Sequence, residues 1–196
     1  MNLIYKSLWK LALAASRKRL CLKGARFVTD RRGGAAVEFA FILPVMLILY
    51  LGSVEVCQMI SVYRLVNLTT STVTNLVAQY TTISASQVMP DILHASVQVL
   101  YPNPSSNAAV VVSCITIDAN RNATIAWSQT LNGTARTVGQ AVTVPAALDI
   151  ANTTVVLGET TYSYTPPLDF LNFGPFSLYS SIYMLPRAST TINLTS

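Results

Sequence analysis

The segment from Phe39 to Val54 contains sixteen residues without a charged side chain. Together with the residues just before it, this segment makes an apolar stretch of about 20 residues, the length an α-helix needs to cross about 30 Å of hydrocarbon. Pro44 lies inside the stretch. It would cost about 3 kcal/mol in a soluble helix, whereas a membrane helix tolerates it as a local kink. The segment therefore predicts one transmembrane helix at about residues 36–55.

The charged residues are distributed unevenly along the chain. Nine of the thirteen lysines and arginines, but one of the eight acidic residues, lie in residues 1–33. Residues 34–196 thus hold four basic and seven acidic side chains, and the net charge of +5 comes from the N-terminal segment. A basic block directly before an apolar span is typical of a cytoplasmic flank. The distribution predicts a cytoplasmic leader and argues against nucleic acid as a partner.

Beyond the apolar span, the sequence continues to about residue 80 without glycine or proline. Apolar residues recur there at roughly helical spacing, although the threonines and serine of residues 69–74 are mediocre helix formers. A second helix is expected within residues 83–104, where two prolines end the pattern. Ser84 and Gln87 fit a capping box at the start of that helix.

From residue 108 onward the sequence is rich in β-branched residues that alternate with polar ones. Four such stretches, separated by turn residues, predict a meander of about four antiparallel strands. One amphipathic helix would cover one face of this sheet, which makes the fold class α+β: a long N-terminal helix, a short helix and an antiparallel sheet of about four strands. We expect a basic leader (1–33), a membrane-spanning and extended helix (34–82) and an extracytoplasmic α+β head (83–196).

No recognisable catalytic constellation is present in the sequence. The chain has one histidine, His94, which belongs to no motif and is expected on the surface of the second helix. Its cysteines, Cys21, Cys57 and Cys114, lack the C-x-x-C spacing of zinc sites and do not form a disulfide framework. Phosphate-binding and dinucleotide-binding glycine motifs are also missing. We therefore expect no catalytic residue, no metal, no cofactor and no small-molecule substrate, and a protein that is not an enzyme.

The stretch DRRGGAAVEFAF places two arginines and two glycines directly before the apolar run. Counted from Gly34 as the first residue, Glu38 is the fifth and Phe39 the sixth. Gly33, the four residues 34–37, the pair Glu38-Phe39 and then an apolar helix together resemble the processing site of type IV pilins. With the basic leader and AAVEFAFILPVMLILYLGSVEV, the chain resembles the TadE/TadG-like pseudopilins (minor pilins) of the Flp, or tight adherence, type IV pilus system.

The resemblance implies that a membrane prepilin peptidase cuts between Gly33 and Gly34 on the cytoplasmic side. The two glycines offer an extended backbone without side chains that a protease cleft can admit, and Arg31 and Arg32 would hold the bond at the cytoplasmic face. A carboxylate near the membrane core costs about 2.5–3.5 kcal/mol on insertion scales. The resemblance implies that the Glu-Phe pair takes part in assembly, and that Glu38 is neutralised by the new N-terminal amine of a neighbouring subunit.

The function implied is that of a TadE-like minor pilin or pseudopilin, a structural protein in the biogenesis of Flp-type pili used for adherence and surface colonisation. Its partners would be membrane lipid, the prepilin peptidase and other pilins and pseudopilins of the machinery. It would lie in the bacterial inner membrane as a single-pass protein with a cytoplasmic N-terminus and a periplasmic head, or enter the pilus. A mature chain of 163 residues, counted from Gly34, is far longer than the short Flp major pilin, so the main fibre subunit is not expected.

Two other interpretations of these residues remain open. The carboxylate of Glu38 also suits a helix N-terminus, where the helix dipole favours anions. Glu55 lies 17 residues further on, about 25 Å along a helix, and is expected to mark the outer membrane interface.

A competing function is an uncleaved single-span anchor that displays an extracytoplasmic ligand-binding domain. Four tyrosines that alternate along two expected strands would then line a polar-aromatic surface: Tyr162, Tyr164, Tyr179 and Tyr183. Packing within the sheet is the other explanation for these tyrosines.

Overall fold

The computed structural model describes residues 34–167 and 174–196 of the chain. The leader expected at residues 1–33 lies outside the described residues. The chain divides into two compact units, Met1–Gly52 and Ser53–Ser196.

The long helix expected at about residues 36–80 is confirmed. Helix α2 runs from Gly34 to Ala78 and has 45 residues, with Pro44 inside it. Its buried residues all lie between Val62 and Ala78, at helical spacing on one side. We refer to residues 53–78, which belong to the second unit, as the C-terminal part of α2.

Helix α2 continues unbroken through the threonine-rich residues 69–74. Thr70 Oγ1 donates a hydrogen bond to the Val66 carbonyl at 2.9 Å, and Thr74 Oγ1 donates one to the Thr70 carbonyl at 2.6 Å. These hydroxyls are therefore satisfied within the helix although both residues are fully buried. Tertiary packing, more than intrinsic propensity, stabilises this stretch as helix.

The second unit contains a four-stranded sheet made of β2 (Ala108–Ile117), β3 (Ala123–Leu131), β4 (Thr153–Tyr164) and β5 (Phe176–Met184). The strand order is β3-β2-β4-β5, and every neighbouring pair is antiparallel. The predicted number of strands and their antiparallel pairing are confirmed, but the predicted meander is wrong, because β4 pairs with β2 and not with β3. The long connection at residues 132–152 allows this crossing, whereas a meander needs a tight turn.

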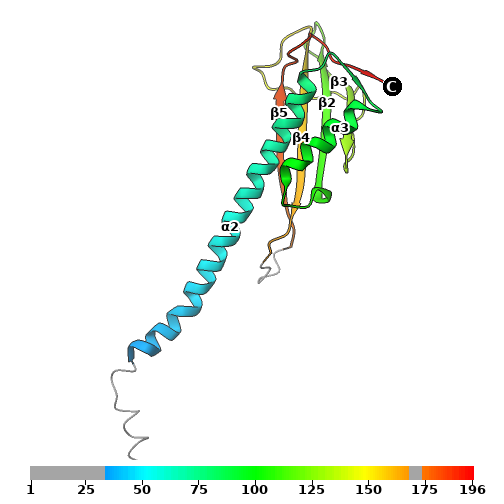
Figure 1. Ribbon diagram of the computed structural model, residues 1–196. Coiled ribbons are helices and arrows are strands. Elements are labelled where there is room, and N and C mark those ends of the chain that lie inside the picture. Colours follow the sequence, from blue (N-terminus) through cyan, green and yellow to red (C-terminus); the bar gives the residue numbers. More distant parts are fainter. Residues whose placement is uncertain (1–33, 168–173) are drawn as a thin grey trace, which may run out of the picture. The chain divides into compact units, whose positions relative to one another are not determined.

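Helix α3 (Val88–Val97) and the C-terminal part of α2 cover the same face of the sheet (Figure 1). One hydrophobic cluster joins these two helices to the sheet. Its buried members include Val66, Val73, Val77, Leu93, Val97, Val110, Val112, Val156 and Tyr162. The sequence predicts one covering helix, but the long helix also supplies a large share of this core.

Gly158 in β4 allows α2 to approach the sheet closely. A Cβ atom at this position would lie 1.9 Å from Thr74 Oγ1 and 3.3 Å from the Thr70 carbonyl oxygen. Since real contacts between such atoms are well above 3 Å, only glycine fits here without moving the helix.

The second helix begins later than the capping-box pattern predicted. Ser84 lies in strand β1 (Thr82–Ser84), which pairs in parallel with β6 (Asn193–Thr195). The residue before α3, Gln87, makes no side-chain cap hydrogen bond. The predicted Ser84 cap is therefore wrong, because pairing with the C-terminal strand holds Ser84 in an extended conformation. His94 lies exposed on α3, as expected.

Short 3-10 turns connect α3 to the sheet: η2 (Gln98–Leu100) follows the helix directly, and η3 (Ser105–Asn107) precedes β2. The opposite face of the sheet carries a second, smaller cluster of buried residues: Ile115, Ile117, Ile125, Val155 and Leu157. The connection between β3 and β4 covers this cluster with Val142, Val144 and Leu148. The sheet is therefore buried on both faces at this end.

Candidate functional site

The first turns of α2 carry the described part of the expected processing and assembly site. Gly34 is the first residue of α2, and Glu38 and Phe39 follow in its second turn. Arg31, Arg32 and Gly33 lie outside the described residues. The structure therefore describes one side of the expected cleavage site, as the beginning of a helix.

The apolar residues of α2 from Ala35 to Tyr50 are exposed. Phe41 is 76% exposed, Leu49 68% and Ile48 65%, and their neighbours are similar. The most apolar 18-residue window of this helix has a mean hydropathy of 2.1, and none of it is buried. A soluble protein rarely exposes an apolar surface of this extent. Among the described residues, α2 is the one helix long and apolar enough to cross a membrane.

Glu38 is not placed well for the helix dipole. The first turn of α2 contains no acidic residue, and Glu38 is the fifth residue of the helix. The dipole effect falls off within the first turn of a helix. The helix dipole therefore contributes little to stabilising the Glu38 carboxylate. Along the helix axis, Glu38 lies about 6 Å from Gly34, at 1.5 Å per residue. The carboxylate and the Gly34 nitrogen are thus on neighbouring turns of one exposed helix.

Glu55 lies at the start of the second unit and is half-buried. Burial raises the pKa of Tyr164, and the nearby charge of Glu55 raises it further. Tyr164 is the last residue of β4, so the position of Glu55 corresponds to the end of the sheet at which β4 ends and β5 begins. Its expected role as an interface marker stays a prediction.

The four tyrosines that the alternative function requires do not share one surface. Tyr162 and Tyr164 are buried in the cluster beneath the helices. Tyr179 pairs with Thr161 and Tyr183 with Leu157, which places both on the opposite face of the sheet. Sheet packing, the other explanation, therefore accounts for Tyr162 and Tyr164, and no polar-aromatic surface joins all four.

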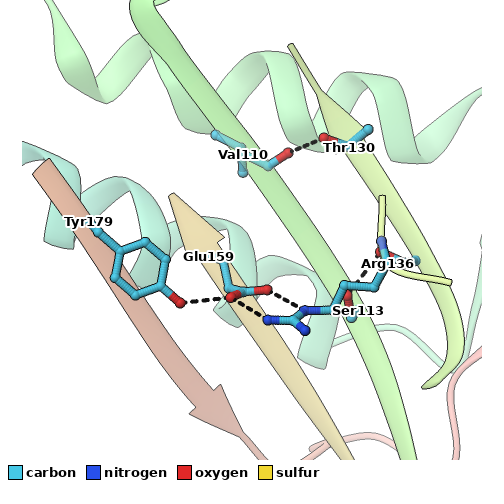
Figure 2. A network of polar contacts seen from close by, with 7 residues as sticks. Val110, Ser113, Thr130, Arg136, Glu159 and Tyr179 are labelled. Carbon is cyan, nitrogen blue, oxygen red and sulfur yellow. Dashed lines mark hydrogen bonds and ion pairs between the residues drawn. The ribbon is translucent and has the colours of Figure 1, made fainter. Parts of the chain in front are cut away.

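A polar cluster on that opposite face was not anticipated from the sequence (Figure 2). The Nε and Nη2 atoms of Arg136 donate to the two carboxylate oxygens of Glu159, both at 2.7 Å, and Tyr179 Oη donates to Glu159 Oε1 at 2.7 Å. The Arg136 backbone N–H donates to Ser128 Oγ at 3.0 Å, and this hydroxyl lies 2.9 Å from Ser113 Oγ. The cluster connects β2, β3, β4 and β5 through the connection after β3.

The electrostatics of this cluster are those of a satisfied ion pair. Burial alone would raise the pKa of Glu159, but the hydrogen bonds from Arg136 and Tyr179 outweigh it and lower that pKa overall. The hydrogen bond to Glu159 raises the pKa of Arg136. Burial, followed by the bond to Glu159, raises the pKa of Tyr179. The carboxylate is thus held ionised between two donors, an arrangement suited to bracing a sheet face rather than to transferring a proton.

A shallow hollow of about 290 Å³ lies beside the cluster, lined by Ala109, Val111, Gly133, Thr134, Thr161 and the three residues of the ion-pair network. The signal in the sequence was a single glutamate inside an otherwise uncharged strand, TTVVLGETTYSY, because a half-buried charge needs a partner. Its partner, 23 residues earlier, shares no motif with it.

The described residues hold no group of three metal-ligating side chains. Cys57 is exposed and Cys114 is buried, and both are free thiols. Burial raises the pKa of Cys114 to about 12, so this thiol stays protonated and unreactive at neutral pH. Its Sγ lies 3.9 Å from the Ile192 carbonyl oxygen, to which Trp127 Nε1 also donates at 2.8 Å. These contacts attach the C-terminal segment to the sheet.

Comparison with known families gives a match to the part of the chain that contains the exposed helix. Residues 33–74 match the family model described as TadE-like protein. This segment is similar to TadE-like proteins. The resemblance seen in the sequence is therefore confirmed for the helix and its first residues, and the match ends before the first strand of the four-stranded sheet. It supports a membrane-anchored protein associated with the Tad pilus.

No curated protein matches this chain, and no solved structure matches it. The strand-rich remainder of the chain is therefore described from its own residues.

Proposed function

We propose that this protein is a TadE-like minor pilin or pseudopilin that is processed by a prepilin peptidase and takes part in assembling an Flp-type pilus. The observation that carries the proposal is an exposed apolar helix that begins at Gly34, follows the basic Arg31-Arg32 pair, and has Glu38-Phe39 at its fifth and sixth positions. The family match to residues 33–74 supports it.

In this proposal residues 1–33 are a cytoplasmic leader, residues 34–82 a membrane-spanning and extended helix, and residues 83–196 a periplasmic head. The positive-inside rule supports this orientation, because nine basic residues precede the span. The partners are membrane lipid, the prepilin peptidase and other pilins and pseudopilins.

Cleavage between Gly33 and Gly34 would give the helix a new α-amino group. Glu38 lies one turn away from it along α2, so the helix of a neighbouring subunit displaced by a small axial step could bring its amine to this carboxylate. Such a pair would remove the cost of a lone charge in the membrane, about 2.5–3.5 kcal/mol at the centre and less near the interface. It would also favour one axial register between packed helices.

Mass spectrometry of the full chain, extracted from membranes of cells that express the peptidase, tests the processing. The expected N-terminus is Gly34. A Gly33→Val variant should retain the leader, because its side chain adds bulk beside the bond where the protease cleft admits a backbone without side chains, whereas the matched Ala36→Val variant should still be cut. An intact leader on the unaltered chain would contradict the processing.

The role of Glu38 needs a separate experiment. A Glu38→Gln variant should insert and be cut normally, but should reduce piliation strongly, since the amide cannot neutralise an amine. The matched Glu55→Gln variant removes a carboxylate at the outer end of the expected span and should leave piliation close to normal. Normal piliation with Glu38→Gln would refute the pairing while leaving the processing site intact.

A further inference from the structure

Strand β5 has an outer edge that is unpaired among the described residues. With the strand order β3-β2-β4-β5, β5 is one edge of the sheet. Within residues 34–167 and 174–196, its backbone pairs with β4 and with no other segment. An unpaired strand edge is a template for another strand, and proteins usually protect it with charges, prolines or bulges. The sequence of β5, FSLYSSIYM, has no charge and no proline, and its pairing with β4 has no register shift.

The other edge, β3, is paired on its outer side over the first three of its nine residues. The connection after β3 folds back along residues 123–125 of this strand: Ile125 N donates to the Gln140 carbonyl at 3.0 Å, and Val142 N donates to the Ala123 carbonyl at 3.0 Å. Among the described residues, no backbone bond of this kind reaches residues 127–131 from the outer side. The sheet thus has a nine-residue open edge at β5 and a shorter open edge at residues 127–131.

The two open edges lie at the same level of the sheet. Across the sheet, Ser180 pairs with Thr160, Thr160 with Val110, and Val110 with Leu131. In the same way, Met184 pairs with Val156 of β4, Val156 pairs with Cys114 of β2, and Cys114 pairs with Trp127 of β3. Residues 180–184 of one edge are therefore level with residues 127–131 of the other. Three antiparallel steps separate β5 from β3, so the two strands run in opposite directions.

We propose that β5 of one copy pairs with residues 127–131 of β3 in the next copy, so that the sheet continues antiparallel from copy to copy. A level pairing places Met184 opposite Trp127, Ile182 opposite Gln129 and Ser180 opposite Leu131. Neither segment carries a charge, so no like charges meet across the junction. The contact is head-to-tail, and such contacts build open chains unless the rotation closes them.

The membrane anchor selects this pairing over β5 with β5. Glu55 in α2 lies near Tyr164 at the end of β4, and Thr74 lies over Gly158 further back along β4, so the C-terminal part of α2 runs along the strand. A two-fold β5–β5 pair would reverse one copy, and its α2 would then lead away from the membrane of the other. The β5–β3 pair keeps both copies in one orientation. The inference rests on the membrane anchoring proposed above and does not require cleavage at Gly33.

Disulfide trapping of the full chain in membranes tests the pairing. In a background with Cys21→Ser and Cys57→Ser, Ser181→Cys and Thr130→Cys are combined, because these positions face each other in the level pairing. Within one chain they lie three strand spacings apart, about 14 Å, whereas a disulfide needs Cβ atoms about 3.5–4.5 Å apart. Every bond formed by mild oxidation is therefore intermolecular, and a ladder of dimers, trimers and larger species is expected on non-reducing gels.

Two control variants and a second cysteine pair complete the test. Ser181→Cys alone should stay monomeric, and Ser181→Cys with Thr124→Cys, in the paired segment of β3, should not form a ladder. Dimers from Ser181→Cys alone would overturn the proposal in favour of a β5–β5 pair. Absence of a ladder from both Ser181→Cys/Thr130→Cys and the second pair Ile182→Cys/Gln129→Cys, with unchanged circular dichroism and thiols that react with maleimide, would overturn it outright. The N-terminus of each sample is read by mass spectrometry, so failed processing is distinguished from failed pairing.

Discussion

The close approach of α2 to the sheet at Gly158 makes a quantitative prediction for Gly158→Ala. The added methyl group would lie 1.9 Å from Thr74 Oγ1 and 3.2 Å from Thr74 Cβ. Thr74 Oγ1 already donates to the Thr70 carbonyl at 2.6 Å, so it cannot rotate away without losing that bond. Overpacking of this kind costs about 1–3 kcal/mol, and alanine recovers about 0.5–1 kcal/mol of strand preference. We expect a net loss of about 1–2 kcal/mol in the free energy of unfolding.

Thermal unfolding of the full chain in detergent, followed by circular dichroism, measures this loss. For a chain of this length, 1 kcal/mol lowers the midpoint by about 2–4 °C, so Gly158→Ala should lower it by several degrees. Gly52→Ala is the matched control, because no heavy atom lies within 4 Å of the Cβ atom it adds. It should leave the midpoint unchanged or raise it slightly, since alanine favours helix.

A second substitution separates the clash from other effects of the alanine. Thr74→Ala removes the hydroxyl group that the new methyl group meets, so Gly158→Ala/Thr74→Ala should be more stable than the sum of the two single changes by about 1 kcal/mol. Additive effects, or a midpoint for Gly158→Ala equal to that of the unaltered chain, would refute the argument that glycine sets the distance between α2 and β4.

Three further predictions use the same unfolding assay or thiol labelling. Glu159→Gln should cost about 1–2 kcal/mol at pH 7; because the folded-state pKa of Glu159 is lowered, the difference from the unaltered chain should be full above its ordinary value of 4.5 and vanish as the pH falls through the lowered pKa. Equal stability at pH 7 would mean that the ion pair contributes nothing. Trp127→Phe removes the 2.8 Å bond to the Ile192 carbonyl and should cost about 1–2 kcal/mol; an unchanged midpoint would show that the C-terminal segment is held by other contacts. Cys114, whose pKa burial raises to about 12, should react with maleimide only after denaturation, whereas exposed Cys57 should react in detergent before it; rapid labelling of native Cys114 would contradict its burial.

Local sequence patterns were sufficient to predict those helices and strands that depend mainly on the residues of their own segment. The sixteen uncharged residues from Phe39 to Val54 and the periodicity after them predicted one long helix, and α2 begins and ends within two residues of the expected bounds. Strand composition predicted four antiparallel strands, because β-branched alternation is a property of each segment. The Gly-Gly and Glu-Phe spacing predicted the TadE-like resemblance, which the match to residues 33–74 confirmed.

Features that depend on distant residues were not predictable in this way. The exchange of a meander for the order β3-β2-β4-β5 depends on which strands bury each other's side chains, and alternation is the same in both arrangements. Ser84 has the sequence signature of a helix cap, but a strand more than 100 residues later pairs with its segment. The tyrosines form a single series in the sequence, whereas the pleat and register of β4 and β5 place them on opposite faces.

The amino-acid sequence was enough to predict the apolar anchor, its basic flank and the spacing of the residues expected to be processed, because each follows from charge, hydropathy and local order along one segment. Other features exist only where segments far apart in the chain meet. These are the close packing of α2 against Gly158, the ion pair between Arg136 and Glu159, and the two unpaired sheet edges among the described residues. Their distances, burial and strand directions are set by packing between elements, and no segment alone encodes them.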